Sequence, residues 1–554
     1  MIKKLLPFLI LLMAPALQAQ CAGGGTCNLS SPSSSAFQAA LNSVNTDGTV
    51  VNVTGNITLN NVTWVQTNSI VIQGTTTVTG TCAPANQGGT CVPTDGTVIN
   101  GPGGAKTLSI VTLAGKSLRV TGIEFIIPFN ATAVFGDINI SGGSTSVRFD
   151  HDHFFTSCGC TSSGGHLFQW DANPGVVDHS YFDAPPNVTS NPNTIGTNVF
   201  FFQVTNTGSD GTGNATWAQP DGFGGSNFLF VENDWFQNGT FVADTDFGGR
   251  AVYRYDNIGP TTRIQTHGTG SAPPKRSGRA VEMYNNNFAF VSSPTAFNSF
   301  GELIDLEGGT GLEWGNAVSG FTNFIVADVV RTEAPSSCGG VNGTYCQTAV
   351  PSGFGYCATS PIGGVAGPSP WDSSGSGPCL DNIGRGQGDL VNCATFSTFP
   401  CNNTTTGTPF WTHEVLSPHY SFLNVVSPVP SSTTNYWNVH TNTGIGTLNN
   451  REYYFDCGTY NSSCSSFTGA AGTGNGLLSA RPSSCTAGVG YWATDTQTLY
   501  TCNSGGNAWT AYYTPYTYPH PLVTGGSVTP PTNGAFGTIM VGKLISPKES
   551  HENK

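Results

Sequence analysis

The chain has 554 residues, which is enough for several compact domains or for one elongated domain. Only 9% of the residues are charged and the formal net charge is −13, so nucleic acid and acidic membrane surfaces are not expected partners. Low charge and 72 glycines are also typical of disorder, but 11% aromatic residues and regularly spaced apolar positions favour stacked strands with frequent turns.

Residues 1–19 have the features of a secretory signal peptide. Lys3 and Lys4 precede an apolar run at residues 5–12, and this run is too short to span a membrane. No later stretch is apolar and long enough for a transmembrane helix. We therefore expect a secreted protein, whether extracellular, periplasmic or at the cell surface. Cys21 leaves lipid attachment as a less favoured alternative.

The 16 cysteines all follow this signal, and an even number in an exported chain predicts disulfides. Four close pairs are plausible, while the connectivity of the remaining cysteines stays open. The plausible pairs are Cys82 with Cys91, Cys393 with Cys401, Cys457 with Cys464, and Cys485 with Cys502.

The first predicted element is a helix at residues 33–44. Phe37, Ala40, Leu41 and Val44 follow the spacing of one helical face. An open end of a stack of strands exposes apolar side chains and unpaired backbone, so it needs a cover. We expect this helix to be that cap.

A three-residue signature then recurs along the chain: an apolar residue, any residue, and Gly, His, Asn or Asp. The copies begin 19 to 29 residues apart, which predicts a solenoid with one such strand in each turn. The first position should point inward, its two neighbours outward, and the third position should bend the chain. The copies begin at Val53, Ile72, Ile99, Val120, Phe149, Val177, Val204, Val231, Arg254, Met283 and Leu306.

Two features of this signature need separate comment. His151 and His179 occupy the third position, where a left-handed backbone explains them better than chemistry does. Arg254 is charged in the inward column, so either its strand is irregular or the guanidinium reaches a buried carboxylate such as Asp244 or Asp246. A second inward stack is expected beyond the bend, from aromatic residues such as Phe125, Phe154, Phe182, Phe236 and Phe288.

Beyond residue 333 the pattern is interrupted. Residues 334–413 hold six cysteines and read as a disulfide-rich insertion, residues 414–456 as the last coils, and residues 457–525 as a small β-rich module. This module is expected to cap the solenoid, with sugar binding through Trp492 and Trp509 as the less favoured alternative. Residues 526–554 are expected to form a flexible tail.

These repeats and the helical cap resemble the right-handed parallel β-helix of the pectate-lyase-like superfamily, an all-β fold. The resemblance covers residues 33–330 and resumes near 414–450. It implies a carbohydrate-active protein, but the superfamily also includes esterases, phage tailspikes and surface proteins without catalysis. Polygalacturonase-like motifs are absent at usable positions, and there is no phosphate loop, zinc motif or Gly-x-Ser-x-Gly elbow.

The first candidate site consists of Asp150 and Asp178, with Arg119 and Arg148 beside them. The two carboxylates occupy matching positions on adjacent turns, about 4.8 Å apart at the backbone. Calcium would suit them, because it prefers several oxygen ligands and because enzymes of the resembled superfamily use calcium to bind acidic sugars. The alternative is an Arg–Asp ladder along the surface, which is somewhat favoured. Calcium is the one possible cofactor.

The second candidate site consists of Glu282 and Asp305, which the signature places at matching positions on adjacent turns. Two carboxyl groups about 5–5.5 Å apart act as acid/base and nucleophile in retaining glycosidases. His267 could serve as acid or base, and Arg279 lies in the same turns. The expected substrate-binding residues are Tyr253, Tyr255, Tyr284, Glu307 and Arg250. The alternative is an Arg279–Glu282 ion pair with tyrosines packed on neighbouring loops.

Two functions follow from these patterns. The first is an exported enzyme that cleaves a polysaccharide, as a lyase or a glycoside hydrolase, along the outward face. The second is a non-catalytic adhesion or surface protein, favoured by the low charge and the Thr-, Asn- and Ser-rich surface. The sequence leaves the glycan and the oligomeric state open.

Overall fold

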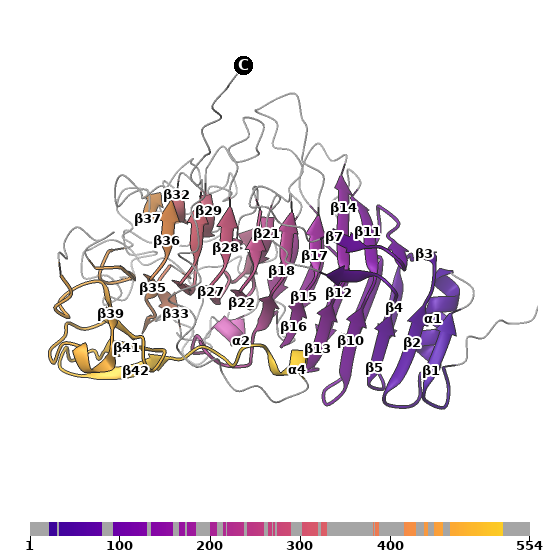
Figure 1. Cartoon of the computed structure of the whole chain (residues 1–554), viewed down its shortest axis with the longest axis horizontal. Helices are drawn as coiled ribbons and strands as arrows, with labels where there is room; N and C mark the ends of the chain where they lie inside the picture. The colour runs from indigo at the N-terminus through magenta and orange to yellow at the C-terminus, as the bar shows by residue number, and fades with distance from the viewer. Residues whose placement is uncertain are drawn as a thin grey trace, which may run out of the picture.

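The computed structural model is dominated by parallel β-sheet, with few helices, and is compatible with a parallel β-helix (Figure 1). It describes residues 21–29, 33–79, 92–129, 135–158, 165–171, 174–183, 200–207, 214–217, 219–237, 241–259, 264–268, 270–271, 274–289, 302–319, 323–328, 381, 383–386, 415–427, 437–440, 448–457 and 466–524. The predicted signal peptide, the predicted tail, most of the predicted insertion and the pairs Cys82–Cys91 and Cys393–Cys401 lie outside these residues.

Three long parallel sheets, here called A, B and C, make up most of the described chain. Sheet A contains, in order, β1 (Thr26–Leu29), β2 (Thr49–Val53), β5 (Ile70–Gln73), β10 (Ser117–Thr121), β13 (Ser146–Asp150), β16 (Gly175–Asp178), β19 (Leu229–Glu232), β22 (Arg250–Arg254), β27 (Ala280–Tyr284), β30 (Thr310–Trp314), β35 (His419–Phe422) and β38 (Tyr453–Phe455).

Sheet B contains β3 (Asn56–Thr58), β8 (Val98–Asn100), β11 (Glu124–Phe129), β14 (His153–Cys158), β17 (Tyr181–Asp183), β20 (Trp235–Gln237), β23 (Asn257–Ile258), β28 (Asn287–Ala289), β31 (Ala317–Ser319) and β36 (Val425–Ser427). Sheet C contains β4 (Val62–Val65), β9 (Leu108–Thr112), β12 (Phe135–Gly142), β15 (His166–Asp171), β18 (Phe200–Thr205), β21 (Phe241–Thr245), β24 (Ile264–Thr266), β29 (Glu302–Leu306), β32 (Asn323–Asp328) and β37 (Trp437–His440).

From β10 to β24 the chain visits the three sheets in strict rotation, one strand in A, one in B and one in C. Each such round, here called a coil, therefore holds three strands and not the single strand that the signature predicted. The inward columns stack along the molecule. In sheet B, for example, the ring of Phe154 lies 5.2 Å from that of Phe125 and 4.8 Å from that of Phe182, as the sequence predicted.

Shorter elements lie outside these sheets. They are the hairpin β6 (Thr77–Thr79) and β7 (Val92–Thr94), the pair β25 (Gly270–Ser271) and β26 (Pro274–Lys275), the pair β33 (Arg385–Gly386) and β34 (Val415–Leu416), α2 (Asn214–Trp217), a 3₁₀ helix at Leu478–Ala480 and α4 (Pro521–Thr524). A four-stranded sheet near the C-terminus contains β39 (Thr473–Gly476), β40 (Gly490–Ala493), β41 (Thr498–Cys502) and β42 (Trp509–Tyr513).

The predicted cap is helix α1 (Ser34–Ser43). Ser33 caps its N-terminus, since the Ser33 hydroxyl accepts a hydrogen bond from the backbone N–H of Ala36 at 3.1 Å. Phe37, Ala40 and Leu41 are fully buried, and the helix contacts β1 and β4 at one end of the stack (Figure 1). The helical periodicity thus identified both the helix and its buried face.

Two disulfides are described in full. Cys485 pairs with Cys502, as predicted, and Cys457 is also disulfide-bonded, although its predicted partner Cys464 lies outside the described residues. Cys21 pairs with Cys27, which leaves no thiol for the lipid attachment considered above. Disulfides hint at an oxidising environment.

The signature found the inward residue of sheet A in most coils but not in all. Ile72, Val120, Phe149, Val177 and Val231 share one register and are buried. The copy at Ile99 belongs to sheet B, and the copies at Val204 and Leu306 belong to sheet C. These three copies were assigned to the wrong column, because an apolar residue followed by a bend ends strands in all three sheets.

Arg254 was misplaced by one residue. Tyr253 is the residue that pairs with Val231 and lies inside the core, while Arg254 pairs with Glu232 and points outward. The bend consequently falls at Tyr255, whose φ is 59°. His151 and His179 have φ values of 57° and 52°, which agrees with the backbone role expected for them.

Candidate functional site

The outward face of sheet A, where both predicted sites were placed, is covered by residues 509–524, here called the C-terminal segment. Figure 1 shows this segment in yellow, running from β42 along the sheet to α4 near β13. The guanidinium of Arg254 donates to the carbonyl oxygens of Tyr516 and Thr517, at 2.8 and 3.0 Å. Arg148 donates to the carbonyl oxygens of Leu522 and Val523, at 3.1 and 3.3 Å.

Glu282 lies beneath this cover and is fully buried. Its carboxylate accepts hydrogen bonds from the hydroxyl of Tyr513 and the backbone N–H of Gly224, both at 2.8 Å. Burial raises the pKa of Glu282 to about 7, although these two hydrogen bonds oppose the shift. The raised pKa would suit a catalytic acid, but the side chain has no surface that a polysaccharide could reach.

The predicted pairing of Glu282 with Asp305 is wrong. Glu282 lies in sheet A, where its register partners are Val252 and Leu312. Asp305 lies in sheet C, where it pairs with Gln265. The two carboxylates therefore do not form the closely spaced pair of a retaining glycosidase. The error arises because Leu306 was taken for a sheet A position.

The predicted sugar-binding tyrosines are packed within the protein. Tyr253 points into the core and is fully buried. Tyr284 is also buried, stacks on Trp314 with ring centroids 4.6 Å apart, and accepts a hydrogen bond from Arg254 at 2.9 Å. Tyr255 stacks on Tyr518 of the C-terminal segment, at 3.7 Å. This outcome agrees with the alternative of tyrosines packed on neighbouring segments.

Arg250 and Arg279 are buried and hold a loop in place. Arg250 donates to the carbonyl oxygens of Thr216, Pro220 and Asp221, at 2.8 to 3.1 Å. Arg279 donates twice to the carbonyl oxygen of Gln219, at 3.1 and 3.2 Å. The expected Arg279–Glu282 ion pair is not among the contacts of the described residues. Together the two arginines fix Thr216 and residues 219–221 beside sheet A.

Asp150 and Asp178 form the Arg–Asp ladder that was the alternative to calcium. Arg119 binds Asp150 through two hydrogen bonds of 2.7 Å, and Arg148 binds Asp178 through two of 2.8 Å. Burial favours the neutral form of Asp150, but hydrogen bonds from Arg119 and His151 and the charge of Arg148 lower its pKa well below the ordinary value. Carboxylate oxygens engaged by guanidinium groups do not fit a calcium site.

His151 and His179 each bind the carboxylate that precedes them. Nδ1 of His151 lies 2.9 Å from Asp150, and Nδ1 of His179 lies 2.9 Å from Asp178. The two rings stack, with centroids 5.3 Å apart. These contacts extend the ladder along the face of the sheet.

Trp492 and Trp509 belong to the C-terminal module. Trp492 is buried against Trp314 and Phe422, with ring centroids 4.9 and 5.2 Å apart. Trp509 is half-buried, and its indole N–H donates to the carbonyl oxygen of Pro482 at 2.7 Å. Trp492 therefore contributes to packing between the module and sheet A and does not offer a ring to sugar.

A different set of polar side chains gathers on the outward face of sheet C, and we call it the sheet C cluster. Its members lie on the strands β15, β21, β24 and β29, and at the residue that follows each of the last three strands. They are His166, Asp244, Asp246, Gln265, His267, Asp305 and Glu307. Three of them, His267, Asp305 and Glu307, were predicted as site residues.

The register of sheet C places these side chains in rows. Asp244, Gln265 and Asp305 are direct neighbours on three successive strands. Each of these strands ends with a second polar residue two positions later: Asp246, His267 and Glu307. Because alternate residues of a strand share one face, the two rows lie side by side.

Short distances connect the rows. His267 lies 4.0 Å from Asp244 through Nε2 and 3.8 Å from Asp246 through Nδ1, and Nε2 of His166 lies 3.6 Å from Asp244. Glu307 accepts hydrogen bonds from the Gln265 amide at 2.7 Å and from the backbone N–H of Gly268 at 2.9 Å. The side chain of His267 is 16% exposed, whereas Asp244 and Asp305 are buried, so among these three residues His267 is the one nearest to solvent.

Backbone contacts hold His267 in position. Its N–H donates to the carbonyl oxygen of Thr245 at 2.8 Å, and its own carbonyl oxygen accepts from Gly278 at 3.0 Å. Nδ1 lies 3.2 Å from the carbonyl oxygen of Gly268, which can only accept a hydrogen bond. This contact favours a proton on Nδ1, in the neutral ring as well as in the charged one.

The sequence analysis missed His166, Asp244, Asp246 and Gln265 as site residues. A signal for three of them is present: Asp244-Thr-Asp246, Gln265-Thr-His267 and Asp305-Leu-Glu307 each place two polar residues on either side of a Thr or Leu at the ends of successive sheet C strands. Aligning these triplets with each other, and not with the sheet A copies, would have assembled the rows.

Comparison with protein-family models, with curated proteins and with solved structures found no match. Among the helices that the structure describes, none combines the length and the apolar character needed to cross a membrane.

Proposed function

We propose that the protein is an exported polysaccharide-cleaving enzyme with a right-handed parallel β-helix of the pectate-lyase-like type. The sheet C cluster is its active site. The observation that supports this proposal is the row Asp244–Gln265–Asp305, with His267 within 4.0 Å of both Asp244 and Asp246. Export is supported by the disulfides and by the signal-like residues 1–19.

The spacing within this row favours a glycoside hydrolase of the inverting type. Asp244 and Asp305 lie two strands apart, so their backbones are about 9.5 Å apart. Inverting enzymes hold their carboxyl groups about 6.5–9.5 Å apart, which leaves room for the attacking water. A retaining mechanism requires the shorter spacing that Glu282 and Asp305 were expected to have.

The histidines suggest which carboxyl group takes which role. His166 and His267 both approach Asp244, and positive charge on either ring would favour the ionised carboxylate. Asp244 is therefore assigned as the base that accepts a proton from water. Asp305 is assigned as the acid that protonates the leaving sugar oxygen as the glycosidic bond breaks and the water oxygen bonds to the anomeric carbon.

A screen of acidic and neutral polysaccharides, with and without calcium, tests this proposal. The expected products are new reducing ends without ultraviolet absorption, because hydrolysis creates no double bond. Proton NMR of the first products should show the anomeric configuration opposite to that of the substrate. Unsaturated products would contradict hydrolysis and indicate a lyase. Glycan binding without any cleavage would contradict catalysis and favour the non-catalytic surface protein.

A further inference from the structure

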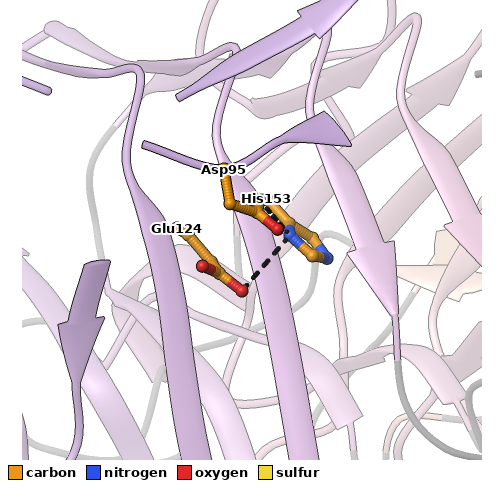
Figure 2. A group of neighbouring side chains, drawn as sticks. All are labelled: Asp95, Glu124 and His153. Carbon is orange, nitrogen blue, oxygen red and sulfur yellow. Dashed lines mark hydrogen bonds and ion pairs between the residues drawn. The ribbon is translucent and has the colours of Figure 1, made fainter. Parts of the chain in front are cut away.

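Three metal-ligating side chains meet on the outward face of sheet B, away from the sheet C cluster (Figure 2). Glu124 is the first residue of β11 and His153 is the first residue of β14, and the two are direct partners in the parallel register. Asp95 follows β7, the second strand of the β6–β7 hairpin. The group therefore joins two coils of the sheet to a hairpin outside it.

The ligand atoms lie at distances that suit a shared metal ion. Nδ1 of His153 is 2.9 Å from an oxygen of Asp95 and 3.6 Å from an oxygen of Glu124, and Figure 2 shows both carboxylates turned toward the imidazole. Two ligands of a tetrahedral zinc ion, each about 2.05 Å from the metal, are about 3.3 Å apart. The two distances in the structure lie on either side of that value.

Glu124 offers a carboxylate that can accept a cation. The residue is 8% exposed, and among the residues that the structure describes its carboxylate contacts His153 at 3.6 Å. A metal ion would supply a closer partner for this largely buried carboxylate. Burial and the negative charge of Asp95 both raise the pKa of Glu124, while His153 opposes the shift.

We propose that Asp95, Glu124 and His153 bind a divalent transition-metal ion, with Zn²⁺ as the best match. One oxygen from each carboxylate and Nδ1 of His153 would be the ligands. A nitrogen ligand favours zinc over calcium or magnesium, which prefer oxygen alone. The side chain of Asp95 is 41% exposed, so a fourth coordination position would face solvent. The bound ion would fasten the β6–β7 hairpin to sheet B.

Binding would change the tautomer of His153. In the metal-free protein Nδ1 of His153 faces carboxylate oxygens and therefore carries a hydrogen. A neutral imidazole that ligates a metal through Nδ1 carries its hydrogen on Nε2, so this hydrogen moves from one ring nitrogen to the other. This change of tautomer distinguishes ligation by Nδ1 from loose attraction of a cation to the carboxylates.

Calorimetric titration of the untagged mature protein with ZnCl₂ tests the proposal. We expect saturable binding, a rise in Tm with zinc, and visible ligand-field bands after substitution with Co²⁺. Glu124→Gln and His153→Gln should each weaken zinc binding at least about 100-fold. Loss of a residue that only hydrogen-bonds to a ligand would weaken zinc binding less than this.

His151→Asn is the matched control. His151 also contacts one carboxylate, and with the stacked His179 it is another place where zinc could bind adventitiously. Asn tolerates the positive φ at this position. Loss of binding in His151→Asn, or unchanged binding in folded Glu124→Gln and His153→Gln, would overturn the proposal. Absence of saturable binding would show that the group is a hydrogen-bonded cluster only. Glycan cleavage by the sheet C cluster is a separate readout.

Discussion

The outward faces of sheets A and C carry similar polar residues but use them differently. On sheet A the register row that holds Arg148 and Glu282 also holds the apolar residues Val176, Phe230, Val252 and Leu312. These apolar side chains form a second hydrophobic core with the C-terminal module. On sheet C the equivalent row is polar over four successive strands, at Gln203, Asp244, Gln265 and Asp305, and continues with Val326. A run of apolar side chains on an outward face needs a cover, and the C-terminal module supplies it on sheet A; the four polar residues of sheet C form no such run.

The largest effect is expected from the sheet C row. Asp305→Asn and Asp244→Asn should each lower the rate of glycan cleavage by about 100- to 10,000-fold, because each removes a proton-transfer group. Reducing-end assays on a polysaccharide identified by the screen measure this effect, and thermal unfolding confirms the fold. Full activity in both variants would show that the sheet C cluster is not the active site.

The next effect is expected from the buried pair beneath the C-terminal segment. Arg254 and Glu232 are fully buried and directly bonded, with Nε of Arg254 2.7 Å from Glu232. Arg254→Ala leaves Glu232 buried without its partner and should cost about 3–5 kcal/mol of unfolding free energy. Denaturant titration measures the loss. Arg119→Ala is the control, since the side chain of Arg119 is 43% exposed and its removal should cost less.

Glu282→Gln should stabilise the protein at neutral and alkaline pH without loss of activity. With a folded-state pKa of about 7, Glu282 holds a proton that the unfolded chain releases near pH 4.5. The contribution of this group to native stability is therefore complete below about pH 4.5. It falls as the pH rises toward 7, by about 1.4 kcal/mol for each pH unit in that window. Gln removes this dependence.

Unfolding free energies at pH 4 and pH 8 check that sign. The gain of Glu282→Gln over the parent protein should be larger at pH 8 than at pH 4. A strong loss of cleavage activity in a stable Glu282→Gln protein would contradict the structural role assigned to sheet A and restore Glu282 as a catalytic candidate.

The smallest effect is expected from Tyr518, which attaches the C-terminal segment to sheet A. The hydroxyl of Tyr518 donates to Asn233 at 2.7 Å, while its ring stacks on Tyr255. Tyr518→Phe keeps the stack and removes one hydrogen bond, which should cost about 0.5–1.5 kcal/mol. Limited proteolysis within residues 509–524 should accelerate modestly. A loss as large as that of Arg254→Ala would show that this single contact controls the cover.

Local patterns were sufficient for several predictions. The apolar spacing of α1 identified its buried face, and the bend residues His151 and His179 were assigned correctly because a left-handed backbone restricts residue type locally. The Arg–Asp ladder was foreseen as the alternative to calcium, because residues at equal positions of parallel strands must be neighbours. Disulfide Cys485–Cys502 followed from a short separation.

The pairing of Glu282 with Asp305 failed for a physical reason. A strand that ends in a bend looks the same in sheet A and in sheet C, so the sequence period alone does not say which side of the coil a strand occupies. One misassigned copy, at Leu306, moved Asp305 to the wrong face. The Asp95–Glu124–His153 group was also missed, because Asp95 lies outside the repeat and only the folded hairpin brings it to the sheet.

The sequence by itself determined that the chain builds stacked parallel strands behind a helical cap, because apolar periodicity and bend residues act within a few positions of each other. The tertiary structure alone decided which polar row is covered. Tyr513 reaches Glu282 across 231 residues, and no local pattern contains a contact of that separation. The face that the C-terminal segment covers is the one where the end of the chain finds enough apolar surface to bury.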